Sequence, residues 1–220
     1  MSPSKSVTRT WRKGEPAYPP QLAACLGGAA PAAVTLVGPD RQKPGSATES
    51  GVPLSPSLAL FCSAQAPAGI LLAVHDLAQQ WRQGNNTIIS GFHSPAEKEA
   101  FHVLLRGPAP IIHCPARSLA KMRLDWPHKM AIGAGHLWLL SPFPDTIRRA
   151  TKETAHFRNR FAAALADAVL IAYAHPGGKT EQLAQEVIAW GKPAYTIDHP
   201  ANENLLALGA TPLAKEEDSL

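Results

Sequence analysis

From residue 58 onward, short apolar runs alternate with longer segments in which apolar residues recur every three or four positions. An apolar run of this kind is typical of a strand that is covered on both faces, and the intervening spacing is that of a helix with one buried side. Strands that alternate with helices indicate a parallel sheet with crossover helices. The fold class that we expect is therefore α/β, a doubly wound, mostly parallel sheet of about six strands.

The segments between the strands carry helix start and stop signals. Ser94, Pro95 and Glu97 form a capping box that starts a helix after the second strand. Further helices are expected after the first strand, from about Asp145 onward, and over residues 179–190, where Gly191 ends the pattern. The region between the third and fourth strands is less regular. The expected strands are residues 58–63, 86–91, 109–114, 136–141, 168–174 and 193–198.

The chain divides at a change in composition. Proline and glycine interrupt the first 56 residues before any long element can form. We expect a small N-terminal segment and linker over residues 1–56, a main domain over 57–213 and a frayed tail over 214–220.

Composition limits the classes of partner. A net charge of +4 and a pI of about 9.1 permit an anionic partner without requiring one. Cys25, Cys62 and Cys114 form no paired set, which suits a reducing cytoplasm. The sequence has neither a signal peptide nor a long apolar run, so no membrane contact is expected. The histidines lack metal-binding spacing, and neither a metal nor a cofactor is expected.

Small and polar residues follow several of the expected strands. Open parallel sheets bind their ligands beyond the carboxyl ends of the strands. Such residues let backbone N–H groups approach an anion, so these positions predict a phosphate or nucleotide site, with ordinary turns as the alternative. The candidates are Ser63, Ser90, Gly91, Phe92, His93, Arg117, Ser141, Gly177, Gly178, Lys179 and Thr180.

The glycine turn at Gly177 and Gly178 feeds a helix whose free N–H groups and dipole favour an anion. It is not a regular P-loop, because the first glycine of that motif would fall on Tyr173. Asp198 ends the last expected strand and could act as a Walker-B-like carboxylate. An atypical P-loop-like nucleotide hydrolase therefore stays open as an alternative.

The sequence Phe-Arg-Asn-Arg at 157–160 places two arginines on one expected helix. Residues two apart on a helix point about 200° apart, so Arg158 and Arg160 cannot reach one ligand from the same face. One of them is expected to bind phosphate and the other to form an ion pair within the protein. Which arginine faces the ligand stays open.

Two stretches resemble the DprA/Smf (DNA processing protein A) family. The first is TIISGFHSPAEKEAFHVLL, and the second runs from FRNR through the glycine turn to the closing N-x-L-x-x-x-G-A segment. The resemblance implies an extended Rossmann-like domain that binds single-stranded DNA and helps to load a recombinase during bacterial natural transformation. The positions that match the family pattern are Ser90, Gly91, Arg158, Asn159, Arg160, Gly177, Gly178 and Thr180.

The chain departs from the family pattern at two strand exits. The family's G-S-R after the first strand is replaced here by CSAQ, so the arginine expected to grip DNA is missing. Its S-G-x-x-x-G-I-D is replaced by SGFHSPAE, and no winged helix or N-terminal helical domain is expected.

The glycine turn is also similar to the P-G-G-x-G-T-x-x-E motif of the Lonely-guy (lysine-decarboxylase-like) phosphoribohydrolases. Releasing a base from a nucleotide needs a carboxylate at the ribose and an arginine at the phosphate. Glu181 and Glu186 lie near the required position but out of register, and Arg158 or Arg160 could hold the phosphate. If the protein is an enzyme, Glu181, Glu186 and Arg158 are its candidate catalytic residues.

The function that we expect is non-catalytic binding of single-stranded DNA or a nucleotide phosphate. Arg158, Asn159 and Arg160 would act with the strand-exit residues, and Phe92 or Phe143 could stack on a base. A recombinase partner follows from the family resemblance alone, and a homodimer is a further expectation.

Overall fold

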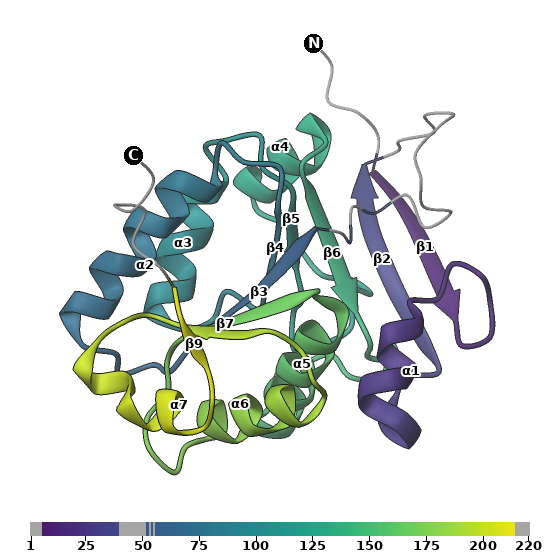
Figure 1. Cartoon of the computed structure of the whole chain (residues 1–220). Coiled ribbons are helices and arrows are strands. Elements are labelled where there is room, and N and C mark those ends of the chain that lie inside the picture. Colours follow the sequence, from purple (N-terminus) through teal and green to yellow (C-terminus); the bar gives the residue numbers. More distant parts are fainter. Residues whose placement is uncertain (1–5, 40–51, 53, 55, 214–220) are drawn as a thin grey trace.

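The computed structural model describes residues 6–39, 52, 54 and 56–213. The expected tail at 214–220 and most of the expected linker lie outside these residues. One nine-stranded sheet runs through the molecule in the order β1-β2-β6-β5-β4-β3-β7-β8-β9. Helices cover both faces of the sheet, so the predicted α/β class is confirmed (Figure 1).

Six parallel strands form the centre of the sheet and match the six expected ones. Leu58, Ile88 and Ile111 and the residues that follow them lie in register across neighbouring strands. Nearly all of their side chains are buried, as expected for strands that are covered on both faces. The strands are β3 (Ser57–Cys62), β4 (Thr87–Ser90), β5 (Ile111–His113), β6 (Leu137–Ser141), β7 (Ala168–Tyr173) and β8 (Ala194–Thr196).

The predicted number of strands was too low, because three more strands extend the sheet at its edges. β1 (Ser6–Arg12) pairs with β2 (Ala33–Pro39), which pairs antiparallel with β6, and β9 (Thr211–Pro212) joins β8. The described prolines and glycines of this region lie in the turns around α1 (Pro20–Leu26) or at the ends of α1 and β2, so they end elements without preventing them. Within β1 only Trp11 is buried, which leaves a weak strand pattern in the sequence.

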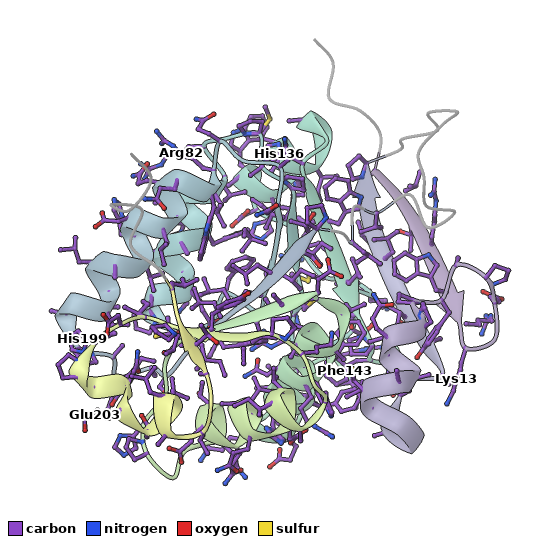
Figure 2. All side chains as sticks on the ribbon, viewed as in Figure 1. Lys13, Arg82, His136, Phe143, His199 and Glu203 are labelled. Atoms are coloured by element: carbon purple, nitrogen blue, oxygen red, sulfur yellow. The ribbon has the colours of Figure 1, made fainter. Side chains whose placement is uncertain are left out.

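The helices form two layers. α2 (Ala68–Trp81), α3 (Pro95–Leu104) and α4 (Trp126–Ala134) pack on one face of the sheet. α1, α5 (Lys152–Leu165) and α6 (Lys179–Ala189) pack on the other face, with the short α7 (Glu203–Ala207). Side chains fill the space between the sheet and both layers (Figure 2). No helix among the described residues is long and apolar enough to cross a membrane.

Two helix predictions were wrong. α5 begins at Lys152 and not near Asp145, because Thr151 caps it and forms a reciprocal pair of hydrogen bonds with Thr154. Asp145 instead accepts a hydrogen bond from the Ser118 hydroxyl. α4 lies in the region that was expected to be irregular, and Asp125 caps its first turn.

Candidate anion-binding site

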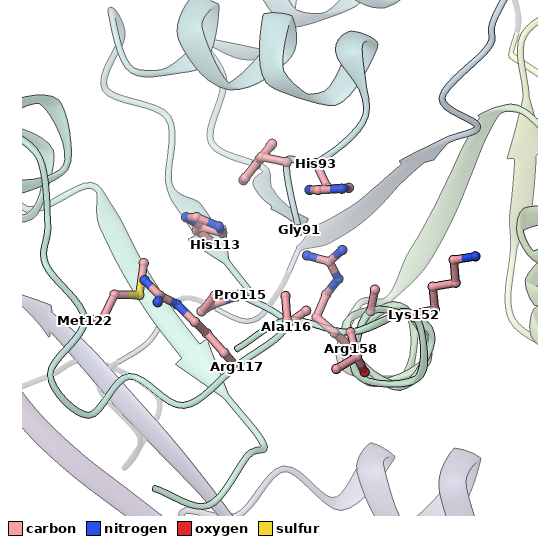
Figure 3. A pocket seen from close by; sticks show the side chains of 13 residues that line it. Gly91, His93, His113, Pro115, Ala116, Arg117, Met122, Lys152 and Arg158 are labelled. Atoms are coloured by element: carbon pink, nitrogen blue, oxygen red, sulfur yellow. The ribbon is translucent and has the colours of Figure 1, made fainter. Parts of the chain in front are cut away.

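A cavity of about 620 Å³ opens beyond the carboxyl ends of β4 and β5. The N-terminal half of α5 and the residues that follow β5 complete its walls (Figure 3). Its lining residues come from four separate parts of the chain that the parallel sheet brings to one edge. They are Gly91, Phe92, His93, His113, Pro115, Ala116, Arg117, Met122, Ala150, Thr151, Lys152, Ala155 and Arg158.

Arg158 of α5 carries a buried positive charge at this cavity, and only 4% of the residue is exposed. Its Nη1 donates to the Cys114 carbonyl oxygen at 2.8 Å, and its Nε donates to Asn159 Oδ1 at 2.7 Å. Burial lowers the pKa of the guanidinium, while Glu97 opposes that shift. Arginine keeps its proton in proteins, so a fixed cation faces the cavity.

Gly91 makes room for this arginine. A Cβ atom built on Gly91 would lie 1.5 Å from Arg158 Nη1 and 1.8 Å from Arg158 Cζ, which no packing tolerates. The guanidinium therefore lies directly against the main chain at the exit of β4 (Figure 3). The next residue, Phe92, has a φ of 49°, a conformation that is rare for a bulky side chain, and its ring stacks on Phe101.

Glu97 joins the strand exits to α3. Its carboxylate is buried and accepts hydrogen bonds from Cys62 N at 3.0 Å, His93 N at 2.9 Å and the Ser90 hydroxyl at 3.3 Å. The predicted capping box is therefore only half present. Ser94 accepts the Glu97 backbone N–H, but the Glu97 side chain binds the neighbouring loops instead of the Ser94 N–H.

The rim of the cavity adds further positive charge. Arg117 and Lys152 lie on opposite walls, and His93 is exposed between them (Figure 3). None of the residues lining the cavity carries a carboxylate. Thr151 and Lys152 also place the N-terminus of α5, with its positive dipole end, at the wall. This charge pattern suits a phosphate or another anion.

Two histidines and an aspartate form a hydrogen-bonded chain behind one wall. Asp125 Oδ1 lies 2.5 Å from His128 Nδ1, and His128 Nε2 lies 3.3 Å from His113 Nδ1. Burial lowers the pKa of His113 to about 3, and the neighbouring His128 and Arg158 add to the shift. His113 is therefore neutral at physiological pH and forms a polar but uncharged part of the cavity wall.

Five of the predicted site residues come together in the cavity, namely Gly91, Phe92, His93, Arg117 and Arg158. Asn159 supports them from behind by accepting the hydrogen bond from Arg158. Ser90 and Ser141 use their hydroxyls within the protein. Each is fully buried and accepts a backbone N–H two residues later, from Phe92 at 3.1 Å and Phe143 at 3.2 Å.

The remaining predicted residues lie around β7 and α6, outside this cavity. Ser63 accepts the N–H of His175, and the N–H of Gly177 donates to Glu181 at 2.7 Å. The protein's own carboxylate thus occupies the place where an anion was expected. Gly178 caps α6, with Lys179 and Thr180 in its first turn, and Lys179 donates to Gln182. Anion binding at this turn stays a prediction.

The two arginines of the Phe-Arg-Asn-Arg sequence separate as their helical spacing requires. Arg160 Nε donates to Glu186 Oε2 at 2.5 Å, whereas Arg158 lines the cavity. Glu181 is held by Gly177 and by Asn204, whose side-chain amide donates to it at 2.5 Å. The structure therefore does not bring Glu181 or Glu186 into the cavity with Arg158, and the phosphoribohydrolase alternative is not favoured.

Several cavity residues were not predicted. His113 ends β5 and could have been found by treating every strand exit alike. Thr151 and Lys152 were missed because the start of α5 was placed too early. Met122 lies just ahead of the unpredicted α4, and Pro115, Ala116, Ala150 and Ala155 offer no chemical signal in the sequence.

The order of the strands and the layers of helices define a Rossmann-like, doubly wound α/β domain with a cavity at the strand ends whose lining includes two arginines and a lysine. Its solved structural neighbours include two DNA processing A proteins, so the family resemblance of the sequence is confirmed for the fold. No protein-family model matches the sequence, and no curated protein is significantly similar to it.

DNA processing protein A from Streptococcus pneumoniae aligns with a TM-score of 0.74 and 17% identity, over 93% of this chain and 70% of that one. The Helicobacter pylori protein, described for its single-stranded DNA binding mode, aligns with a TM-score of 0.72 and 18% identity, over 94% and 91%. The molybdenum cofactor carrier protein of Chlamydomonas reinhardtii is more distant, with a TM-score of 0.51 and 14% identity over 73% of this chain and 91% of that one.

Proposed function

We propose that this protein binds single-stranded DNA without catalysis and holds a backbone phosphate against Arg158. The observation that carries the proposal is a buried arginine facing a cavity with cationic walls and no lining carboxylate. A guanidinium is well suited to phosphate because its parallel N–H groups match two phosphate oxygens. Arg117, Lys152 and His93 would then contact neighbouring phosphates at the rim.

The structural neighbours support this choice of ligand. The Helicobacter pylori protein of the same fold binds single-stranded DNA. A recombinase partner and a role in bacterial natural transformation also belong to the proposal, and they rest on the family resemblance. A homodimer and a cytoplasmic location are proposed as well, the location because the three cysteines are free. The missing G-S-R arginine is compensated in this proposal by Arg117 and Lys152, which supply charge from neighbouring elements.

The test compares two arginines of one helix. Binding of a fluorescent oligothymidylate is measured by anisotropy across a range of salt concentrations for wild type, Arg158→Gln and Arg160→Gln. Affinity of the wild type is expected to fall steeply with salt, because each neutralised phosphate releases counterions. Arg158→Gln is expected to weaken binding at least tenfold and to reduce the logarithmic salt slope by about 0.7. Arg160→Gln should bind like wild type, because Arg160 is paired with Glu186.

A second variant keeps the test independent of folding. Arg117→Ala combined with Lys152→Ala removes rim charges without opening the core, and it should also weaken binding and flatten the salt slope. Far-UV circular dichroism checks each variant. Salt-independent binding, or equal losses in Arg158→Gln and Arg160→Gln, would contradict the proposal. Mass spectrometry that finds a co-purified mononucleotide would favour the small-ligand alternative.

A further inference from the structure

A second cavity, of about 520 Å³, lies between α3 and α4 and is lined mainly by apolar side chains. Trp126 and Met130 of α4 line it and are unusually open to solvent, with 71% and 45% of each residue exposed. His102 and Arg106 form the opposite wall on and just after α3. A large aromatic side chain exposed in this way costs free energy in the unbound protein and is typical of a binding surface.

The two cavities have no lining residue in common, but packed side chains connect them. His128 of α4 lies 3.3 Å from His113, which lines the first cavity, and its ring packs 5.2 Å from the ring of Phe101 on α3. Pro127, which precedes His128 in the sequence, and His102, which follows Phe101, both line the second cavity. The segment 121–130 also passes from one cavity to the other, with Met122 in the first and Trp126 in the second. Four residues span at most about 14 Å, a reach of a few nucleotides.

The surface between the cavities is basic. Lys121, Arg123 and Lys129 are exposed along the segment 121–130, and Arg106 is exposed on the α3 side of the second cavity. The carboxylate in this segment, Asp125, is hydrogen-bonded to His128. A row of cations with an exposed aromatic ring is the arrangement that binds single strands without regard to sequence, because the cations follow the backbone while the bases stack.

We propose that Trp126 is a base-stacking platform for a single strand that leaves the phosphate cavity and crosses α4. This inference rests on the proposed function. Lys121 and Arg123 would follow the backbone between the cavities, and Arg106 would face the stacked base from α3. The Trp126 site takes a nucleobase and is distinct from the phosphate site at Arg158.

The test compares a single nucleotide with a long strand. Thymidine 5′-monophosphate and a twelve-nucleotide oligothymidylate are titrated against wild type, Trp126→Ala and Trp126→Phe. The longer strand is expected to bind Trp126→Ala about 5- to 150-fold more weakly than wild type, the range measured for the loss of one stacked base. Trp126→Phe should recover most of that loss. Thymidine 5′-monophosphate, which is too short to reach Trp126 from the phosphate cavity, should bind all three proteins equally.

A further variant provides the control, and tryptophan fluorescence provides a second readout. Leu72→Ala on α2 removes another exposed apolar side chain, 63% exposed, and should leave both affinities unchanged. The longer strand should also quench the tryptophan fluorescence of wild type, and this quenching should be smaller in Trp126→Phe. Equal binding of the longer strand by wild type and Trp126→Ala, together with a normal loss in Arg158→Gln, would overturn the stacking site and leave the proposed function intact. No binding of the twelve-nucleotide strand to wild type would overturn both.

Discussion

At the scale of single residues, one contact defines the candidate site. Arg158 is buried because Gly91 lacks a side chain, and it is held by hydrogen bonds to the Cys114 carbonyl and Asn159. A long, flexible side chain is thereby fixed before any ligand arrives, which reduces the entropy that binding must otherwise remove. The sequence indicated both residues, but it could not show that they touch.

Gly91→Ala should therefore weaken binding strongly without removing any charge. The new methyl group must displace the guanidinium, and oligothymidylate affinity is expected to fall at least tenfold, as in Arg158→Gln. Anisotropy titration measures the loss. The matched control is Gly28→Ala, where an added Cβ meets no atom within 4 Å. Wild-type affinity in Gly91→Ala would show that the position of Arg158 is unimportant.

At the scale of elements, the site depends on how α3, α4 and α5 meet the strand exits. Glu97 joins α3 to β3 and β4 through three hydrogen bonds, and His128 joins α4 to β5. The helix starts were only partly predictable. Pro95 marks the start of α3 clearly, but Glu97 serves as a tertiary acceptor, which depends on neighbours that are distant in sequence.

His113 should make stability depend on pH. Its pKa is lowered to about 3 in the folded state, against about 6.5 in the unfolded chain, so between these values the unfolded state binds more protons. The contribution of His113 to the free energy of unfolding is nearly complete above about pH 6.5 and falls as the pH drops. Between pH 7.5 and pH 5 the expected loss is about 1–2 kcal/mol, and solvent screening of the ring keeps it within this range. Urea unfolding at both pH values measures the loss.

The variant His113→Gln should lose that part of the pH dependence, since glutamine does not titrate. His102→Gln provides the comparison, because His102 is exposed on α3. The groups that face His113 are His128, Asp125 and Arg158, and all of them remain in both variants. Parallel pH profiles for wild type and His113→Gln would refute the assignment.

At the scale of the whole molecule, the parallel sheet was predictable and its edges were not. The continuous apolar runs of β3 to β8 identify strands buried on both faces, as Leu60, Ile89 and Ile112 illustrate. In contrast, β1 exposes most of its residues and β9 has only two, so neither leaves a strong pattern. The site was harder to predict because its cavity combines the carboxyl ends of β4 and β5 with the start of α5, and only the folded sheet brings these segments together.

Residues 6–39 share a core with the main sheet, since Trp11 and Val34 pack in the same apolar cluster as Ile112 and Phe161. The expected domain boundary at residue 56 stays a prediction, and Gly38→Ala tests it. An added Cβ at Gly38 would lie 2.4 Å from Trp138 Cδ1, and overpacking of this kind costs about 1–3 kcal/mol.

If the N-terminal strands unfold together with the main sheet, Gly38→Ala should lower the midpoint of a single urea transition, followed by both fluorescence and circular dichroism. Gly28→Ala should leave the midpoint in place. A separate, earlier transition confined to one probe would instead show that residues 6–39 fold as a unit of their own.

The two buried serines at the ends of β4 and β6 have a consequence for the rate of ligand binding. Ser90 and Ser141 close the same kind of tight turn, each accepting a backbone N–H from the phenylalanine two positions on. Loops fastened in this way do not need to rearrange when a ligand arrives. For the proposed single-stranded ligand, encounter would then be governed by diffusion and by attraction to the basic surface, and the lifetime of the complex, more than its rate of formation, would distinguish one strand from another.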